Sequence, residues 1–440
     1  MLLVLYSWLK YETDIFILSQ EFFTMTVDRI NTRGNHYEIG VQQGRQYYSL
    51  VGRISMTKML RGMNFVQSTQ IVSQVGKGVF NFVFDQLIAG GARKMEKSIK
   101  KILPNQHDKL AGIAEGFGLK TEKLAKALFF ENFSVNLDMD TKVPRRPGCT
   151  AGILVNRKNQ AYLAKNYDFP TELEQFQILR FSDLTTNEYS SVGLGEGPMP
   201  GVVSGINEKG LAITMNSAYS KDTKLSNPPG TMFCQEILDT LKTTDEAVEY
   251  LMKAPMPGGW IFIILDKNND GRIVERTATT GAVRPMEPIE DGYIAVATNN
   301  YLNPTTQETE IPEIAEWTIA DLKGLPLVQL SKWRYTRMRE LIEEECKKSK
   351  ITIGSLHKIM SDHKRPPSEV NETICRHSND LFETLSTIYM NPQDMKIAVS
   401  DGNPCINNPI RKFKVNFKYT VPNIRFLRRD SKEDFYDPLF

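Results

Sequence analysis

The 440-residue sequence contains only five cysteines and five histidines. The cysteines are odd in number, widely scattered and never spaced as Cys-x-x-Cys. This distribution argues against a disulfide framework or a zinc site and favours a reducing compartment. The sequence also lacks a Gly-x-Ser-x-Gly elbow before a helical pattern, so a serine triad would have no nucleophile. The five cysteines are Cys149, Cys234, Cys346, Cys375 and Cys405.

The sequence has no excess of one charge, no internal repeat and no low-complexity tract. Its 54 basic and 52 acidic residues leave a net charge of +2. Nothing in this balance favours binding to nucleic acid or to an anionic membrane. With 41% hydrophobic and 24% charged residues, the chain has enough apolar surface to build a folded core.

No hydrophobic run is long enough to span a membrane. Residues 1–9 are apolar, but Lys10 and Glu12 end this run well before the ~20 residues that a spanning helix needs. The run also lacks the positively charged start of a signal peptide. We therefore interpret residues 1–24 as an N-terminal extension, take Met25 as a candidate start and expect a cytoplasmic protein. Secretion and peroxisomal targeting remain open alternatives.

Hydrophobic periodicity divides the chain into a helical part and a mainly β part. Between Asn35 and Phe133, apolar residues recur at three- and four-residue spacing, which predicts helices. After Cys149, short alternating runs bounded by Gly, Pro, Asn or Asp predict strands. Strand runs flanked by helix pairs favour an α+β fold with two sheets between helical layers. The predicted strands are 150–155, 161–165, 177–181, 202–206, 211–216, 260–265, 272–276, 293–298, 384–390, 395–400 and 413–419, and the predicted helices are 231–241, 245–253, 330–347 and 354–361.

A cysteine and a carboxylate are predicted to meet at one end of a sheet. The Gly148–Cys149–Thr150 step follows a proline-marked turn and opens a predicted strand. The next strand would return as a hairpin and bring residues 166–168 back to the end at which the first strand began. Gly148 has no Cβ, so the neighbouring thiol could approach its carbonyl closely. From these residues alone, the alternative is a buried structural cysteine and an aspartate in a turn.

The motif Gly-Cys-Thr, followed 19 residues after Cys149 by the aspartate of Lys-Asn-Tyr-Asp (168 − 149 = 19), resembles the peptidase C45 family. That family includes acyl-coenzyme A:6-aminopenicillanic acid acyltransferases and β-alanyl-amine hydrolases. It belongs to the N-terminal-nucleophile hydrolases, as does choloylglycine hydrolase. The resemblance extends from about His36 to about Lys414 and implies a four-layer αββα sandwich of two antiparallel sheets.

The resemblance also implies that the chain cuts itself between Gly148 and Cys149. Residues 25–148 would then be a helical pro-segment that stays bound as a small subunit, with a linker at 138–147. Residues 149–440 would form the catalytic large subunit. Homo-oligomerisation remains open.

Two asparagines gain roles from the same resemblance. Asn216 ends the strand after an Asn-Glu-Lys-Gly-Leu turn, where related enzymes place an amide that polarises the substrate carbonyl. Asn299 follows Thr298 at the end of a strand, where the family places the asparagine that stabilises the oxyanion. Asn300 is disfavoured because side chains alternate faces along a strand. For Asn216, the alternative is a residue that simply caps a strand.

A helix-opening Ser-x-x-Arg-Tyr-x-Arg string also matches the family. There, the arginine at the position of Arg334 orders the nucleophile, and Arg337 lies three residues further on. The alternative is a solvated basic face. Residues Lys165, Asn166 and Tyr167 precede Asp168 as candidate substrate-binding or supporting residues. Because Lys165 stands where choloylglycine hydrolases have arginine, bile-acid-like recognition is not expected.

A metal site is considered and set aside at Cys375 and His377. Their i, i+2 spacing would place both on one strand face, but without the further ligands that zinc needs. We expect these residues to be architectural and no metal or cofactor to be bound. Asp266–Gly271 mimics a calcium loop, but Thr277 stands where that loop requires glutamate, so a hairpin turn explains it better.

The expected chemistry is that of a terminal cysteine. The Cys149 thiol would attack the carbonyl of Gly148, and hydrolysis of the resulting thioester would free an α-amine. With a pKa of about 7.7 to 8.0, that amine could take the thiol's proton, while Asp168 holds the nucleophile in place. The mature enzyme would act on a linear amide of a small N-acyl amine or on an acyl thioester, with coenzyme A entering only in a thioester substrate. The alternative is an uncleaved, inactive member that serves as a binding or scaffold protein.

Overall fold

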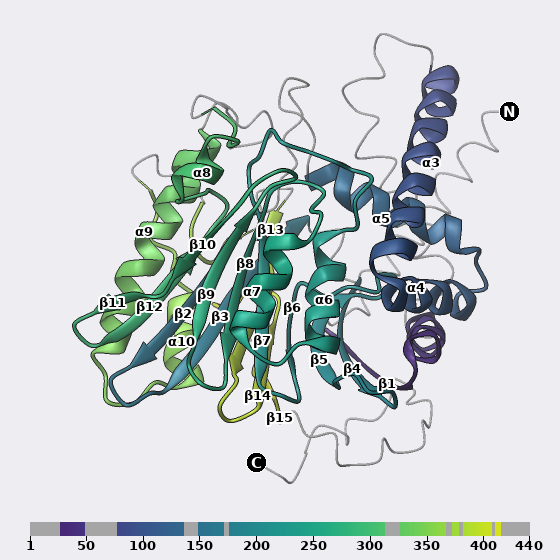
Figure 1. Ribbon diagram of the computed structural model, residues 1–440. Helices are drawn as coiled ribbons and strands as arrows, with labels where there is room; N and C mark the ends of the chain where they lie inside the picture. The colour runs from purple at the N-terminus through teal and green to yellow at the C-terminus, as the bar shows by residue number, and fades with distance from the viewer. Residues whose placement is uncertain are drawn as a thin grey trace, which may run out of the picture.

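The computed structural model describes residues 27–48, 77–135, 148–170, 176–312, 326–366, 372–377, 382–406 and 410–414. Within these ranges the chain forms two large β-sheets with helices on their outer sides (Figure 1). The predicted extension 1–24 and the predicted linker 138–147 lie outside the described residues. Among those residues, no helix is both long and apolar enough to cross a bilayer.

The two sheets are formed by strands from distant parts of the chain. In spatial order, the strands of the first sheet are β1 (Asp28–Gly34), β4 (Gln177–Leu184), β5 (Ser191–Glu196), β6 (Ser204–Asn207), β7 (Leu211–Ser217), β8 (Trp260–Asp266), β9 (Gly271–Arg276) and β10 (Gly281–Pro285). Those of the second are β11 (Glu287–Ile289), β12 (Gly292–Ala297), β2 (Cys149–Asn156), β3 (Ala161–Pro170), β13 (Phe382–Asn391), β14 (Lys396–Asp401) and β15 (Ile410–Lys414).

Helices cover the outer face of each sheet. The helices of the described residues are α3 (Lys77–Ile102), α4 (Pro104–Gly116), α5 (Thr121–Val135), α6 (Gly230–Thr240), α7 (Thr244–Lys253), α8 (Pro304–Gln307), α9 (Leu327–Cys346) and α10 (Ile353–Met360), with a further helical stretch at 36–48. The first sheet packs against α6 and α7, and the second against α9 and α10. The two inner faces meet in one apolar core. The predicted αββα sandwich is therefore confirmed.

Strand β8 shows how the sequence produces these layers. Its run Trp-Ile-Phe-Ile-Ile-Leu-Asp is buried throughout, which is typical of a strand covered on both faces. Ile261, Ile263 and Leu265 enter the core between the sheets. Phe262 and Ile264 point the other way, into the core under the helices. Because side chains alternate along a strand, one short apolar segment supplies two cores.

Every predicted strand and helix after Cys149 that falls within the described residues is present, with shifted ends. The structure adds β5, β10 and β11, which the sequence analysis missed. It also adds β1, which lies in the part predicted to be helical and pairs in parallel with β4, so the first sheet is not wholly antiparallel. β5 carries two glycines and β11 has only three residues, one of them proline, so neither shows the usual strand pattern.

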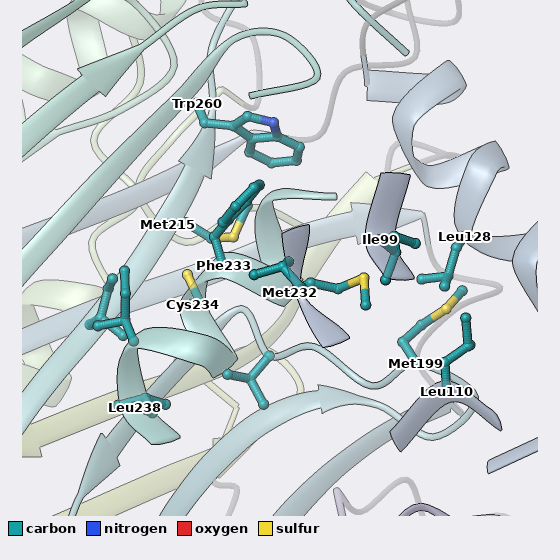
Figure 2. Close-up of a cluster of buried hydrophobic side chains, with 14 of the residues drawn as sticks. Ile99, Leu110, Leu128, Met199, Met215, Met232, Phe233, Cys234, Leu238 and Trp260 are labelled. Atoms are coloured by element: carbon teal, nitrogen blue, oxygen red, sulfur yellow. The ribbon is translucent and has the colours of Figure 1, made fainter. Parts of the chain in front are cut away.

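The N-terminal helices share a hydrophobic core with the first sheet and α6. Ile99, Leu110 and Leu128, from α3, α4 and α5, lie in one cluster with Met232 and Phe233 of α6 (Figure 2). Residues 27–48 and 77–135 are thus packed into the sandwich rather than appended to it. That residues 25–148 form a small subunit after a cut stays a prediction.

Two helices of this region touch through glycines. An ideal Cβ on Gly40 would lie 2.2 Å from the carbonyl oxygen of Lys109, and one on Gly112 would lie 2.2 Å from that of Tyr37. Real Cβ atoms do not approach so closely. The glycine that interrupts the 36–48 periodicity therefore allows the backbone of this stretch to pack directly on α4.

A fully buried ion pair joins α4 to α6. Lys109 Nζ lies 3.2 Å from Asp239 Oδ2, and neither side chain is exposed. Gln106 Nε2 also donates to Asp239 Oδ2, at 2.9 Å. Burial lowers the pKa of Lys109 to about 8, and Asp239 opposes this shift. Each charge thus depends on its partner, because neither can reach water.

We expect Lys109→Met to lower the free energy of unfolding by about 3 to 5 kcal/mol, because the substitution leaves the Asp239 carboxylate buried without its cation. Urea denaturation of the purified protein measures the change. The matched control is Lys209→Met, which removes a lysine from the exposed pair with Glu208 and should cost less than about 1 kcal/mol. Equal losses for the two variants would contradict the role assigned to the buried pair.

Candidate active site

Cys149 is the first residue of β2, between β12 and β3. The predicted hairpin is present, and Tyr167 stands opposite Cys149 in it. Because side chains alternate along strands, Cys149, Lys165 and Tyr167 share the face toward the first sheet. Asn166 and Asp168 share the other face, toward α9 and α10. The side chains of Cys149 and Asp168 therefore leave the second sheet on opposite faces.

Polar side chains from distant segments hold the backbone of Cys149. Its N–H donates to Asn299 Oδ1 at 3.0 Å, and Arg334 Nη1 donates to its carbonyl oxygen at 2.8 Å. Arg334 also donates to Thr150 Oγ1 at 3.1 Å and to Asn299 Oδ1 at 2.8 Å. Only 1% of Arg334 is exposed, so water does not compete for these bonds. The structure thus brings Cys149, Asn299 and Arg334 together.

The turn that carries Asn299 is fixed by Ser331, one helical turn before Arg334 on α9. Ser331 Oγ accepts from the N–H of Asn299 at 2.8 Å. The same hydroxyl lies 3.0 Å from Thr298 Oγ1 and 2.8 Å from Asn300 Oδ1. Ser331 therefore binds the backbone of the Thr-Asn-Asn turn, and Arg334 binds the side-chain amide of Asn299.

The amide groups of the two predicted asparagines point to different partners. Asn299 Nδ2 donates to the carbonyl oxygen of Ser217 at 2.9 Å, so its oxygen faces Cys149 and its nitrogen faces the end of β7. Asn216 Nδ2 donates to the carbonyl oxygens of Ala297 and Thr298, both at 3.1 Å. Asn216 thus ties β7 to the end of β12. The role predicted for its amide at a substrate carbonyl stays a prediction.

Gly148 lies against the guanidinium groups of two buried arginines. An ideal Cβ there would lie 2.2 Å from Arg376 Nη1 and 3.4 Å from Arg334 Nη2. Glu372 forms an ion pair with Arg376 and lies 3.6 Å from Arg334 Nε, so it partly balances the two guanidinium charges. A side chain at this position would displace the Arg376 guanidinium, so glycine lets two buried cations pack against the Cα.

Asp168 faces the same cations. Its Oδ1 accepts a hydrogen bond from Thr384 Oγ1 at 2.7 Å, and its Oδ2 is buried without a hydrogen-bond partner among the described residues. Burial raises the pKa of Asp168 to about 6, although Arg376 and Arg334 both oppose the rise. The carboxylate is therefore ionised at neutral pH and keeps one oxygen available beside the nucleophile's strand.

Lys165 lies beside the Cys149 thiol. Lys165 Nζ donates to the carbonyl oxygen of Met215, and its charge interacts electrostatically with the thiol. Burial lowers the pKa of Lys165, and the nearby thiol opposes this. Burial raises the pKa of the Cys149 thiol, whereas Lys165 opposes that rise. The amine and the thiol thus oppose each other's burial shifts, an arrangement suited to proton transfer between them.

A pocket opens at the thiol, between the two sheets. Tyr167, Phe169 and Trp260 form aromatic walls, and Glu196 supplies a carboxyl group. Tyr167 OH donates to Glu196 Oε1 at 3.1 Å, and the Tyr167 and Phe169 rings stack with centroids 5.1 Å apart. Burial raises the pKa of Glu196 to about 7, and the bond from Tyr167 opposes the rise. The pocket is mainly apolar, with a few polar groups that could orient a ligand.

Two of the other predicted residues lie apart from the thiol. Asn166 Nδ2 donates to the carbonyl oxygens of Met360 and Ile374, at 2.9 and 2.8 Å, so it braces β3 against α10 and the 372–377 segment. Arg337 forms an ion pair with Asp362 at 2.7 Å. Tyr167, in contrast, lines the pocket as predicted.

Sequence reasoning missed the site roles of Arg376, Glu372 and Glu196. Arg376 lies in a segment interpreted as architectural, and no spacing pattern connects it to Gly148. The expectation that Cys375 and His377 lack further metal ligands is wrong. The structure places His363 and Cys405 beside them.

Comparison with known proteins reveals distant relatives. The chain is 22% identical over 233 residues to the β-alanyl-dopamine/carcinine hydrolase of Drosophila melanogaster, a match over 51% of this chain and 56% of that protein. The chain therefore spans just over half the length of this curated relative. Similar solved structures include an N-acylethanolamine-hydrolyzing acid amidase ortholog from Caenorhabditis elegans (18% identity, 56% of this chain and 93% of that one, TM-score 0.38). A variant of the conjugated bile acid hydrolase from Clostridium perfringens is also similar (17% identity, 63% and 100%, TM-score 0.38).

The sequence profile of the acyl-coenzyme A:6-aminopenicillanic acid acyl-transferase family matches residues 155–405. This range covers more than half of the chain and begins six residues after Cys149 (155 − 149 = 6). It includes Lys165, Asp168, Asn299 and Arg334, which the structure gathers around Cys149. On this evidence the chain belongs to the acyl-coenzyme A:6-aminopenicillanic acid acyl-transferase family.

Proposed function

We propose that this protein is an autocatalytically processed amidohydrolase or acyltransferase whose nucleophile is Cys149. The observation that carries the proposal is that three buried polar side chains surround Cys149. Asn299 binds its N–H, Arg334 binds its carbonyl, and Lys165 lines the same pocket and interacts electrostatically with its thiol. A purely structural cysteine would not need three buried polar partners. Such partners are costly to bury and fix the thiol beside the Gly148–Cys149 peptide bond.

The first reaction would cut the chain. Neutral Lys165 takes the thiol proton, and the sulfur attacks the carbonyl carbon of Gly148. The C–S bond forms, the C–N bond breaks, and the proton passes from Lys165 to the departing nitrogen of Cys149. Water then hydrolyses the thioester, which leaves a carboxylate on Gly148 and a free thiol. Arg334 and Arg376, packed against Gly148, are placed to stabilise negative charge that develops there.

The second reaction would use the new amino terminus. The α-amine takes the place of the Cys149 N–H and would remain bound to Asn299 Oδ1. With an ordinary pKa of about 7.7 to 8.0, it can accept the thiol proton near neutral pH. The sulfur then attacks the substrate carbonyl, and the leaving amine or thiol takes the proton. For the predicted oxyanion role, Asn299 would use the second N–H of the nitrogen that already donates to Ser217.

The pocket and the relatives favour a small N-acyl amine or an acyl thioester as substrate. Aromatic and aliphatic walls suit an apolar or aromatic portion, and Glu196 offers a hydrogen-bond acceptor at the pocket wall. The Drosophila relative is a hydrolase of β-alanyl-dopamine and carcinine. Hydrolysis and transfer would differ only in whether water or a second amine reaches the thioester on Cys149. Parallel assays of N-acyl amine cleavage and of transfer from an acyl thioester would distinguish the two.

One observation favours the rival proposal of an uncleaved binding protein. Only 2% of Cys149 is exposed. Under the enzymatic proposal, a thiol probe should label Cys149 in the folded, processed protein, because the new terminus opens access to the pocket. If folded protein stays uncut and Cys149 stays unlabelled, the rival is favoured.

We expect purified wild-type protein to contain two chains, of 148 and 292 residues (440 − 148 = 292), whereas Cys149→Ala should remain one chain. The alanine variant lacks the nucleophile for the N-to-S shift. Denaturing gels and mass spectrometry, with N-terminal sequencing of the larger fragment, provide the measurement. Cys234→Ala, which removes a different buried cysteine, is the control and should still be cut. Uncut wild-type protein, or a cut that survives Cys149→Ala, would refute the proposal.

We expect Lys165→Met to slow self-cleavage by about 10²- to 10⁴-fold, the usual contribution of a positioned base. Lys165→Arg keeps the charge but cannot act as a neutral base, so it should be comparably slow. Cleavage is followed on precursor that has been refolded from denaturant and stopped at timed intervals. Recovery of the wild-type rate in Lys165→Arg would show that the charge alone matters.

We expect the rate of self-cleavage to show an added acid limb below pH 6, of about tenfold per pH unit beyond the fall that protonation of Lys165 causes. Asp168, with its pKa raised to about 6, is ionised above this pH and protonated below it, and only the ionised form balances Arg376 and Arg334. In Asp168→Asn the rate should be low and should lose this acid limb. Asp394→Asn, at an exposed pair with Lys396, should keep it. A limb near pH 6 that persists in Asp168→Asn would assign it to another group.

A further inference from the structure

Four potential metal ligands meet behind the active site, on the side of the second sheet that faces α10. They are His363, Cys375, His377 and Cys405, and their ligand atoms all lie within 4.8 Å of one another. The Nε2 atoms of His363 and His377 are 2.9 Å apart, and His377 Nε2 lies 3.0 Å from Cys405 Sγ. Residues from three separate segments thus aim two sulfurs and two ring nitrogens at one point.

The spacing of these atoms is close to that of a tetrahedral zinc site. Zinc binds sulfur at about 2.3 Å and imidazole nitrogen at about 2.0 to 2.1 Å, so neighbouring ligand atoms in a tetrahedron lie roughly 3.3 to 3.8 Å apart. The observed distances of 2.9 and 3.0 Å are slightly shorter. Side-chain rotations would bring the four ligand atoms, which lie within 4.8 Å of one another, to tetrahedral spacing.

We propose that His363, Cys375, His377 and Cys405 bind one Zn²⁺ ion in a closed Cys₂His₂ site. Both thiols lose their protons on binding and both imidazoles bind as neutral ligands, so two protons are released and the bound site carries no net charge. A tetrahedral set of two sulfurs and two nitrogens matches the ligand preference of zinc. All four positions are filled by protein, so the ion is structural.

The backbone around these residues is already arranged to support the ion. The N–H of Cys375 donates to the carbonyl oxygen of Asp362, next to His363, at 3.1 Å. Asn403 Nδ2 donates to the carbonyl oxygen of Arg376. Cys375 is buried, whereas His363 is exposed, which leaves a route for the ion to enter. Hydrogen bonds thus preorganise the segments that the ion would join.

The zinc ion would hold residues 372–377 in place, and this segment also contributes Arg376 to the candidate active site. Arg376 lies between the ligands Cys375 and His377, and its guanidinium packs against Gly148. The ion would tie residues 372–377 to residues 402–406 and to the end of the α10 segment. This role does not depend on whether Cys149 is a nucleophile, so it can be tested independently.

The test measures zinc in full-length protein purified without a metal-affinity tag and without chelator. Elemental analysis should find about one zinc per chain in the wild type and less than about 0.2 in Cys375→Ser and in Cys405→Ser. Cys346→Ser, which removes a buried cysteine from α9, is the matched control and should keep one zinc. Cys405→His retains a donor at the same position and should retain the metal.

A second measurement uses only wild-type protein, so it does not depend on the folding of variants. Removal of zinc with a chelator should lower the Tm by about 3 °C or more, and added Zn²⁺ should restore it. Co²⁺ added to the zinc-free protein should give the thiolate and ligand-field absorption of a tetrahedral S₂N₂ site. The absence of zinc together with the absence of a cobalt spectrum would overturn the proposal. So would a Cys375–Cys405 disulfide in native protein, or equal zinc in wild type and both serine variants.

Discussion

The arrangement of the candidate site depends on one buried guanidinium. Arg334 donates to the carbonyl of Cys149, to the hydroxyl of Thr150 and to the amide oxygen of Asn299. These bonds connect α9 to two neighbouring strands of the second sheet. A planar guanidinium has enough donors in fixed directions to make them together, which a lysine could not do. Because Arg334 is buried, its charge requires the carboxylates nearby, and Glu372 lies within 3.6 Å.

The same need for neutralisation explains why several charged groups gather around Gly148. Arg334 and Arg376 bring two positive charges, and Glu372 and Asp168 bring two negative ones. None can be removed alone without leaving an uncompensated charge in the interior. The cluster is thus costly to assemble, and the Gly148–Cys149 peptide bond lies at its centre. The 372–377 segment holds this cluster in place, because it carries Arg376 between two potential zinc ligands.

Sequence patterns predicted much of the fold but less of the site. Periodicity located most of the strands after Cys149, because short apolar runs such as that of β8, bounded by turn residues, are typical of strands buried on both faces. It missed β1, whose seven residues become a strand only by pairing with β4, some 150 positions away. The resemblance indicated Cys149, Asn299 and Arg334, and these do meet. It could not indicate which way an amide points, and Asn216 turns out to brace β7 against β12.

The sequence by itself determined the layers and the position of one cysteine at the start of a strand, because alternation and turn residues act over short distances. Only the tertiary structure decided which side chains surround that cysteine. Arg376 and Glu372 reach it from more than 200 residues away, and His363 and Cys405 join Cys375 and His377 across separate segments. No local sequence pattern predicts such long-range contacts. These contacts form because the packing of the whole core brings distant segments of the chain together.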